Sequence, residues 1–350
     1  MQARAFITGV SGPELTVAEH DFIRAERPWG FILFKRNVET PQQVSTLVEE
    51  LRNCVGVPDA PVLIDQEGGR VQRLGPPHWP VYPPGALFGA LYDLDPALGL
   101  AAARLSARSI AADLADLGIS VDCLPLADVP VAGADAVIGD RAYGDRPDKV
   151  AAIARAVTKG LEQGGILPVL KHIPGHGRAT ADSHLRLPEV KTPKKELERT
   201  DFAAFQALAD LPMAMTAHVV FSVLDPVHPA TTSATIIEQV IRGVIGFQGL
   251  LMSDDVSMNA LSGSIAERTG AIFSAGCDVV LHCNGKLEEM RQVAAKTPEL
   301  SGKALERAKL ALASRRAAEP FDRMAARSEL DAMKSKAGTL VAHDRGNSIV

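Results

Sequence analysis

The feature that most constrains the fold of this chain is a regular alternation of short apolar runs with longer segments of helical periodicity. Short buried strands separated by helices indicate βα units with parallel strand pairing. Eight strands in this rhythm predict an α/β fold, a closed (β/α)8 barrel of the TIM type, because an open doubly wound sheet usually has fewer. The predicted strands are Ala5–Thr8, Gly30–Phe34, Pro61–Asp65, Ser120–Leu124, Leu167–His172, Met213–His218, Leu250–Asp254 and Asp278–Cys283.

The segments between these strands predict the helices and one long loop. The stretch Gly75–Pro84 (GPPHWPVYPP) is too rich in proline for a helix and predicts a loop after the third strand. The predicted helices are Pro41–Val55, Pro96–Leu117, Lys149–Gln163, Pro193–Leu208, Ser233–Gly243, Ser264–Ala275 and Lys286–Ala295.

The domain organisation is predicted to be a single domain with a tail. Residues 1–300 are expected to form the barrel. Residues 301–350 are expected to form a tail that is helical over Ala304–Ala317 and mixed beyond. We expect the tail to pack on the barrel or to be partly disordered.

The composition argues against several classes of protein. The 350 residues carry a net charge of −5, and scattered Lys and Arg residues form no basic patch for a nucleic acid. No apolar run approaches the roughly 20 residues of a membrane helix, and the first residues do not resemble a signal peptide. We therefore expect a cytoplasmic protein whose four cysteines are reduced thiols. A monomer is the default expectation.

Polar side chains gather where the predicted strands end, which is where active sites form in this kind of barrel. Each also has a structural interpretation: Asp65 pairs with Arg70 or Arg73, Lys171 and His172 form a buried polar set, and Asp254 caps a helix. Five such groups at successive strand ends favour a shared site. The groups are DQEGGRVQR from Asp65, Asp128 with IGDR from Ile138, KHIPGHG from Lys171 followed by DSH from Asp182, TAH from Thr216, and MSDD from Met252.

These motifs, in this order, resemble family 3 glycoside hydrolases. The likeness is to the single-barrel bacterial β-N-acetylhexosaminidases of peptidoglycan recycling and covers roughly Asp65 to Met258, carried by DQEGGRVQRL, IGDRAYG, KHIPGHG, DSH and MSDDVSM. The resemblance implies a retaining exo-β-N-acetylglucosaminidase. Its expected substrate is N-acetylglucosaminyl-β-1,4-anhydro-N-acetylmuramic acid, with or without peptide, and neither a cofactor nor a metal is expected.

The resemblance also assigns roles to individual residues. Asp254 corresponds to the nucleophile, His184 to the acid/base and Asp182 to the aspartate that orients it. The residues that correspond to the family's sugar-binding set are Asp65, Arg73, Arg141, Lys171 and His172. Two positions depart from the pattern: Arg178 stands where many relatives have an acidic residue, and Ile173 replaces a common aromatic.

The residue types suit the implied chemistry. A carboxylate nucleophile divides one displacement into two steps through a glycosyl ester. Lys171 and Arg73 could keep Asp254 ionised. A histidine titrates near neutral pH and can donate and accept a proton. In extended backbone, Asp182 and His184 point the same way, so the carboxylate can orient the imidazole.

Four other functions stay open from the sequence. A phosphorylase would release N-acetylglucosamine 1-phosphate, and Asp254 with Asp255 could serve a substrate-assisted mechanism. A metal-dependent hydrolase could use His172, His176, His184 and His218, although their spacing is not that of a helical ligand pair. A sugar-binding protein without activity is the fourth.

Overall fold

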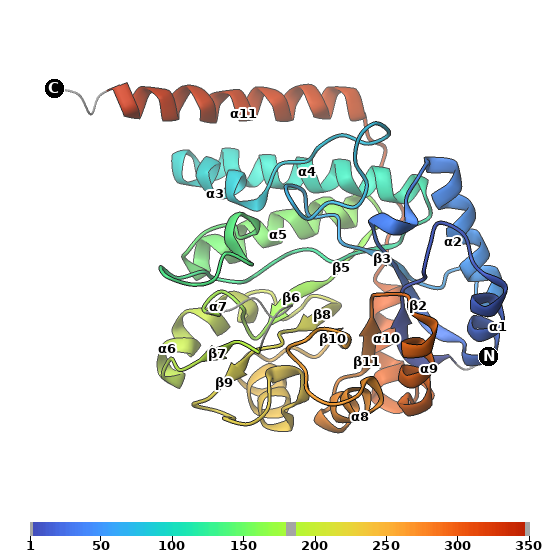
Figure 1. The fold of residues 1–350 in the computed structure, drawn as a ribbon. Coiled ribbons are helices and arrows are strands. Elements are labelled where there is room, and N and C mark those ends of the chain that lie inside the picture. The colour runs from blue at the N-terminus through green and yellow to red at the C-terminus, as the bar shows by residue number, and fades with distance from the viewer. Residues whose placement is uncertain (1–2, 180–186, 347–350) are drawn as a thin grey trace.

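The strands of the computed structural model form a parallel barrel, which confirms the predicted fold class (Figure 1). The structure describes residues 3–179 and 187–346. Within these residues a nine-stranded sheet has the order β5-β4-β3-β2-β1-β11-β10-β8-β6. Its strands are β1 (Arg4–Thr8), β2 (Pro28–Leu33), β3 (Val62–Ile64), β4 (Val121–Asp122), β5 (Leu167–Pro168), β6 (Leu170–Ile173), β8 (Met213–Thr216), β10 (Leu250–Asp255) and β11 (Val279–His282).

The barrel closes because the predicted fifth strand is divided into β5 and β6. These two strands are separated only by Val169, whose N–H is donated to the carbonyls of Asp122 (3.1 Å) and Leu124 (2.7 Å). β5 pairs with β4, while β6 pairs with β8 and forms a bridge from Lys171 to Leu126. The prediction of one continuous strand over Leu167–His172 was therefore wrong in this detail, although the (β/α)8 plan holds.

Helices surround the sheet in the predicted alternation. The predicted helix Pro41–Val55 has the observed bounds, and four others agree within about two residues at each end. The helices of the barrel are α1 (Val17–Glu26), α2 (Pro41–Val55), α3 (Gly85–Leu94), α4 (Pro96–Asp116), α5 (Pro147–Gln163), α6 (Lys194–Arg199), α7 (Asp201–Gln206), the π-helix η4 (Ile236–Val244), α8 (Ile265–Ala275) and α9 (Leu287–Lys296). Short 3-10 turns are η1 (Lys35–Asn37), η2 (Gly139–Arg141) and η3 (Ala230–Thr232).

Several elements differ from the prediction. The helix expected over Pro193–Leu208 breaks at Thr200, whose hydroxyl lies 2.7 Å from both the Glu196 carbonyl and the Asp201 carboxylate, either of which can accept its proton. Such side-chain bonds compete with the helical ladder. The helix predicted over Ser233–Gly243 is a π-helix. Helices α1 and α3 and the small parallel pair β7 (Glu189–Val190) with β9 (Val220–Phe221) were not predicted.

Two shells of apolar side chains hold the barrel together. The inner shell fills the barrel and includes Ile7, Ile32, Leu63, Met215 and Leu281. The outer shell packs the other faces of the strands against the helices. Burial on both faces explains why the strands are continuous apolar runs rather than alternating ones. All four cysteines are free thiols, as predicted.

The tail adds two helices, α10 (Gly302–Ala313) and α11 (Arg323–Gly346). Ala308 and Ala311 of α10 belong to the inner shell, so α10 covers one end of the barrel. α11 packs along α4 through Ala326 and Leu330, at the top of the view in Figure 1. The expectation of mixed structure beyond Ala317 was wrong, because residues 323–346 form one long helix.

The loop between β3 and α3 is ordered by its own hydrogen bonds, which confirms the loop predicted over Gly75–Pro84. The Gln72 side-chain amide donates to the carbonyls of Leu74 (2.6 Å) and Pro80 (2.7 Å) and accepts from the N–H of Tyr82 (2.9 Å). The Tyr82 hydroxyl donates to the buried Asp113 (2.7 Å). This loop therefore forms a fixed wall beside the carboxyl ends of the strands.

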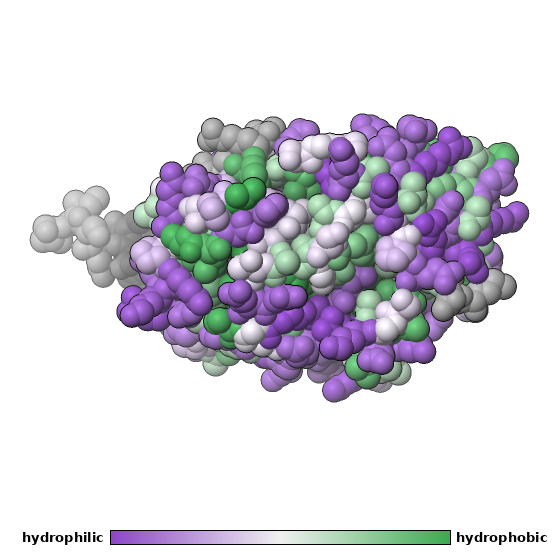
Figure 2. All heavy atoms as spheres, turned by 90° about the horizontal axis from the view of Figure 1, so that it is seen from below, coloured by the Kyte–Doolittle hydropathy of each residue, from purple (hydrophilic) through white to green (hydrophobic). Residues whose placement is uncertain are grey.

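On the face that Figure 2 shows, hydrophobic side chains are scattered among hydrophilic ones. Such scattered apolar residues are normal on a protein surface. Among the helices that the structure describes, none is both long enough and apolar enough to cross a bilayer.

Candidate active site

A cavity of about 440 Å³ opens at the carboxyl ends of the strands, the place where enzymes of this architecture bind their substrates. The sequence predicted eight site residues, and six of them line this cavity: Asp65, Arg73, Arg141, Lys171, His172 and Asp254. Lys171 and His172 are consecutive residues of β6, joined by a cis peptide.

Asp65 directly follows β3 and accepts from two cations. Lys171 Nζ lies 2.9 Å from its Oδ1, and Arg73 Nη2 lies 3.0 Å from its Oδ2. Burial would raise the pKa of Asp65, but Lys171 and Arg73 outweigh burial and hold the pKa well below its usual range. Asp65 is therefore ionised at neutral pH. Of the two partners suggested by the sequence, Arg73 is the one that pairs, because Arg70 pairs with Asp140 (3.0 Å).

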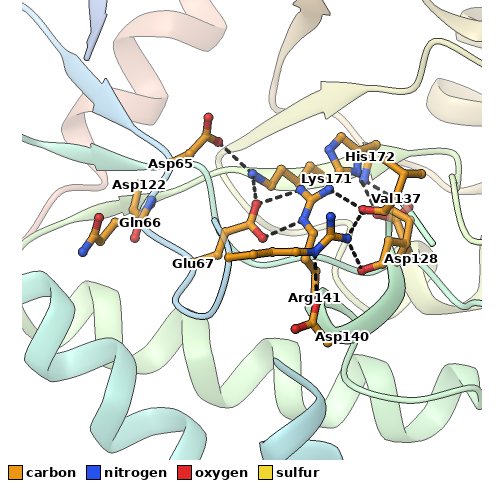
Figure 3. A network of polar contacts seen from close by, with 12 residues as sticks. Asp65, Gln66, Glu67, Asp122, Asp128, Val137, Asp140, Arg141, Lys171 and His172 are labelled. Atoms are coloured by element: carbon orange, nitrogen blue, oxygen red, sulfur yellow. Dashed lines mark hydrogen bonds and ion pairs between the residues drawn. The ribbon is translucent and has the colours of Figure 1, made fainter. Parts of the chain in front are cut away.

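Glu67 also contacts Lys171 and adds a third cation of the cavity, Arg141 (Figure 3). Both of its oxygens accept from Arg141, from Nε and Nη2 at 2.8 Å each, and Oε1 lies 2.6 Å from Lys171 Nζ. Burial would raise the pKa of Glu67, but Arg141 and Lys171 lower it to about 2. Burial likewise opposes the charge of Lys171, yet Asp65 and Glu67 raise its pKa. The result is one buried network of two carboxylates and three cations.

Asp128 fixes His172 from below the cavity. Its Oδ2 lies 2.7 Å from His172 Nδ1, and its Oδ1 accepts the N–H groups of His176 (2.7 Å) and His172 (3.3 Å). Burial would raise the pKa of Asp128, but His172 lowers it, so the carboxylate is charged. A charged acceptor at Nδ1 selects the Nδ1–H tautomer. Nε2 of His172 is then left to interact with a ligand.

Asp254 lies at the end of β10 and lines the cavity. Its N–H donates to the Thr216 hydroxyl (3.3 Å), which ties the strand end to β8. The neighbouring Asp255 has a structural role, because its carboxylate accepts from Ser257 (2.6 and 3.0 Å) and from the N–H of Cys283 (3.1 Å). These bonds do not favour a mechanism in which Asp254 and Asp255 share one task.

The other two predicted site residues, Asp182 and His184, lie outside the described residues. The chain before them is held closely. A Cβ on Gly177 would lie 2.2 Å from the Val129 carbonyl oxygen, so this position requires glycine. The next residue, Arg178, pairs with the buried Asp201 (2.6 Å) and with Glu196 (3.1 Å). The departure from the family pattern at Arg178 thus has a structural partner in α6 and α7.

Glu67 and Asp128 were noticed in the sequence as strand-end acids but received no role. Glu67 alternates with Asp65 in DQEGG, and Asp128 stands four residues after the end of its predicted strand. The spacing alone could have indicated carboxylates close to Lys171 and His172. It could not show which base each acid pairs with, because the partners are up to 104 residues away (67 to 171).

Residues 15–316 match the family described as "Glycosyl hydrolase family 3 N terminal domain". This match spans most of the chain, so the chain belongs to glycoside hydrolase family 3. It is therefore a glycosidase, with a barrel fold and a pocket of the kind this class uses.

The relatives within the family include β-hexosaminidases and an enzyme of known structure. The chain is 38% identical over 280 residues to a β-hexosaminidase of Alkalilimnicola ehrlichii, covering 79% of each chain. It is 37% identical over 297 residues to a β-hexosaminidase of Xanthomonas campestris, covering 83% of this chain and 88% of the relative. A crystal structure of NagZ from Neisseria gonorrhoeae in complex with N-trifluoroacetyl-D-glucosamine superimposes with a TM-score of 0.82 at 30% identity. That comparison covers 97% of this chain and 98% of NagZ.

Proposed function

We propose that this family 3 enzyme is a retaining exo-β-N-acetylglucosaminidase that removes a terminal β-1,4-linked N-acetylglucosamine. The observation that carries the proposal is the joint presence of Asp65, Arg141, Lys171, His172 and Asp254 around one cavity. The β-hexosaminidase relatives support the proposed hydrolysis of a β-hexosaminide. The N-trifluoroacetyl-D-glucosamine bound to the Neisseria enzyme supports N-acetylglucosamine as the sugar that is released.

The proposed division of labour follows from the chemistry of the site. Asp254 attacks the anomeric carbon and forms a glycosyl ester, which water then hydrolyses. His184, oriented by Asp182, first protonates the leaving oxygen and then deprotonates the water. Asp65 accepts hydrogen bonds from sugar hydroxyls, while Lys171, His172, Arg73 and Arg141 supply the complementary contacts.

We further propose that the natural substrate is an N-acetylglucosaminyl-anhydro-N-acetylmuramic acid, with or without peptide, in cytoplasmic peptidoglycan recycling. Support comes from the similarity to NagZ and from the family motifs. Neither a cofactor nor a metal has a role in this scheme, and the enzyme is proposed to act as a monomer.

The first experiment is hydrolysis of 4-nitrophenyl N-acetyl-β-glucosaminide beside the matching β-glucoside, with and without phosphate and EDTA. We expect release of free N-acetylglucosamine that neither additive alters, and little release from the glucoside. Formation of N-acetylglucosamine 1-phosphate would show that the enzyme is a phosphorylase and not a hydrolase. Loss of activity in EDTA would show that the reaction depends on a metal.

Two variants test the proposed roles of the catalytic residues. Asp254→Ala should lower kcat at least about 10³-fold, equivalent to about 4 kcal/mol of transition-state stabilisation. His184→Ala should reduce kcat strongly for poor leaving groups and least for 4-nitrophenol, which leaves without protonation. An equal loss across leaving groups would show that His184 is not the acid.

A further inference from the structure

Glu67 contacts two of the proposed sugar-binding cations at once, yet it does not itself line the cavity. Lys171 and Arg141 line the cavity, whereas Glu67 lies behind them and its side chain is only 4% exposed. We propose that Glu67 is a positioning residue that orients Lys171 and Arg141 toward the terminal sugar. This inference rests on the proposed function, because it assumes that these two cations bind that sugar.

The hydrogen bonds of Arg141 show how the orientation is achieved. Glu67 takes Nε and Nη2 of the guanidinium in a bidentate pair, and Nη1 donates to the Val137 carbonyl (3.2 Å). A bidentate pair fixes the plane of the guanidinium as well as its position. Since a guanidinium carries five N–H donors, donors remain beyond those three bonds.

Lys171 is constrained in the same way. Its ammonium group has three donors, and Asp65 (2.9 Å) and Glu67 (2.6 Å) each accept one. Two fixed carboxylates determine the direction of the third N–H. Without Glu67, the ammonium would be held by Asp65 alone and could rotate about that contact.

The segment that carries Glu67 is itself firmly held. The N–H of Glu67 donates to the Val71 carbonyl (2.9 Å), and the Gln66 side chain accepts from the N–H groups of Arg73 (2.9 Å) and Leu74 (3.0 Å). The carboxylate therefore sits on a rigid turn. Groups that support a binding residue in this manner matter because misplacement by about 1 Å can cost roughly 10²-fold in rate.

The test uses Glu67→Gln and Glu67→Asp. The first keeps the shape and removes the charge; the second keeps the charge and withdraws the oxygens from Arg141. We expect both to lower kcat/KM for 4-nitrophenyl N-acetyl-β-glucosaminide about 10- to 100-fold. Circular dichroism and thermal melting identify the folded variants. If Glu67→Gln does not fold, Glu67→Asp alone tests the inference.

Monodeoxy versions of the substrate separate positioning from a purely structural role. If Glu67 acts through the cations, wild type and variant should become nearly equal on the substrate that lacks the hydroxyl bound by them. A purely structural defect would lower activity by the same factor on every analogue, and that result would overturn the inference.

Asp210→Asn is the matched control, because Asp210 makes a bidentate pair with Arg155 (2.5 and 2.8 Å) but is 69% exposed and outside the cavity. It should leave kcat/KM unchanged. If Glu67→Gln matches wild type while wild type hydrolyses the substrate, the inference alone is wrong. Absence of hydrolysis by wild type would instead overturn the proposed function, and the inference with it.

Discussion

At the residue scale, the cavity holds three cations that are paired with two carboxylates. Arg73, Arg141 and Lys171 are largely removed from water, and unpaired buried charges are costly. Asp65 and Glu67 compensate them directly, and each carboxylate pairs with two bases. In the proposed function, these groups offer the sugar charge-assisted donors and acceptors, which are stronger than neutral ones.

Asp128→Asn should alter the way His172 meets the sugar. The asparagine oxygen is expected to take the place of Oδ1, which accepts two backbone N–H groups. Its NH₂ group then faces His172 Nδ1 and selects the opposite tautomer, with the proton on Nε2. An analogous tautomer reversal in a catalytic triad is highly damaging. We expect kcat/KM to fall at least about 10-fold, and ¹⁵N NMR of the imidazole to show the reversed tautomer.

Asp225→Asn provides the control for Asp128→Asn. Asp225 also accepts two backbone N–H groups and contacts a histidine, His228 (3.2 Å), which is 57% exposed. Activity should not change in this variant. Unaltered kcat/KM in Asp128→Asn, with its tautomer reversed, would show that Nε2 of His172 does not contact the substrate.

The sequence located the cavity residues better than it described their contacts. Asp65, Lys171 and Asp254 were predicted at strand ends, and the parallel barrel brings such ends together. Their partners could not be derived, because pairing depends on side-chain directions at the rim. The sequence interpretation expected Lys171 and Arg73 to serve Asp254, whereas both form ion pairs with Asp65. The catalytic and binding roles stay predictions.

At the element scale, the strand end that carries Lys171 and His172 is connected to α6 and α7 through one arginine. Arg178 donates to Asp201 from Nε (2.6 Å) and to the Thr200 hydroxyl from Nη2 (3.1 Å). Asp201 begins α7 and is 2% exposed. The position where the β6 loop departs from the family pattern is therefore joined to the helical layer.

Arg178→Met should destabilise the protein, because it leaves the Asp201 carboxylate buried with only Thr200 as a described side-chain donor. Breaking a buried ion pair by removing one partner costs about 3–5 kcal/mol. Urea denaturation should show this loss in the free energy of unfolding. The double variant Arg178→Met with Asp201→Asn should recover part of it, since the unpaired charge is gone.

Arg155→Met is the comparison, because it removes a similar ion pair with Asp210 that is largely exposed. Exposed pairs contribute about 0–1 kcal/mol. A loss of the same small size in Arg178→Met would mean that water replaces the guanidinium at Asp201.

The sequence predicted elements whose periodicity is strong and missed those decided by single contacts. Helix α2 carries a Pro at its first position and a Gly directly after its end, and its bounds were predicted correctly. The break at Thr200 depends on a hydroxyl that bonds to Glu196 and Asp201, which periodicity does not reveal. The helix α11 was missed because its sequence has few apolar positions, and its neighbour α4 supplies the packing.

At the scale of the whole molecule, the barrel is closed at one end by α10 and opens at the other into the active site. Leu300, Ala308 and Ala311 join the inner shell, beneath strand residues such as Ile7 and Leu63. The apolar interior thus supports the polar network from below. Buried charges lie at the open end, and their protonation links the stability of the molecule to pH.

Acid should destabilise the whole protein in two stages. Burial and the neighbouring His172 lower the pKa of His176 to about 4, against 6.5 in an unfolded chain. Between pH 6.5 and 4 the unfolded state therefore binds a proton that the folded state does not bind, so stability falls as pH falls. The expected loss is on the order of 3 kcal/mol. Glu67, whose pKa is about 2, adds a second loss below about pH 4.5.

The two stages can be separated by measuring the free energy of unfolding in urea from pH 7.5 to 3.5. His176→Gln should be less stable than wild type at pH 7.5 yet lose less stability between pH 6.5 and 4.5, because the imidazole of residue 176 no longer contributes to the linkage. His78→Gln, at an exposed histidine of the loop after β3, should keep the wild-type slope. If His176→Gln also keeps that slope, His176 does not couple folding to protonation, and the loss between pH 6.5 and 4.5 must come from another buried imidazole such as His282, whose pKa burial also lowers.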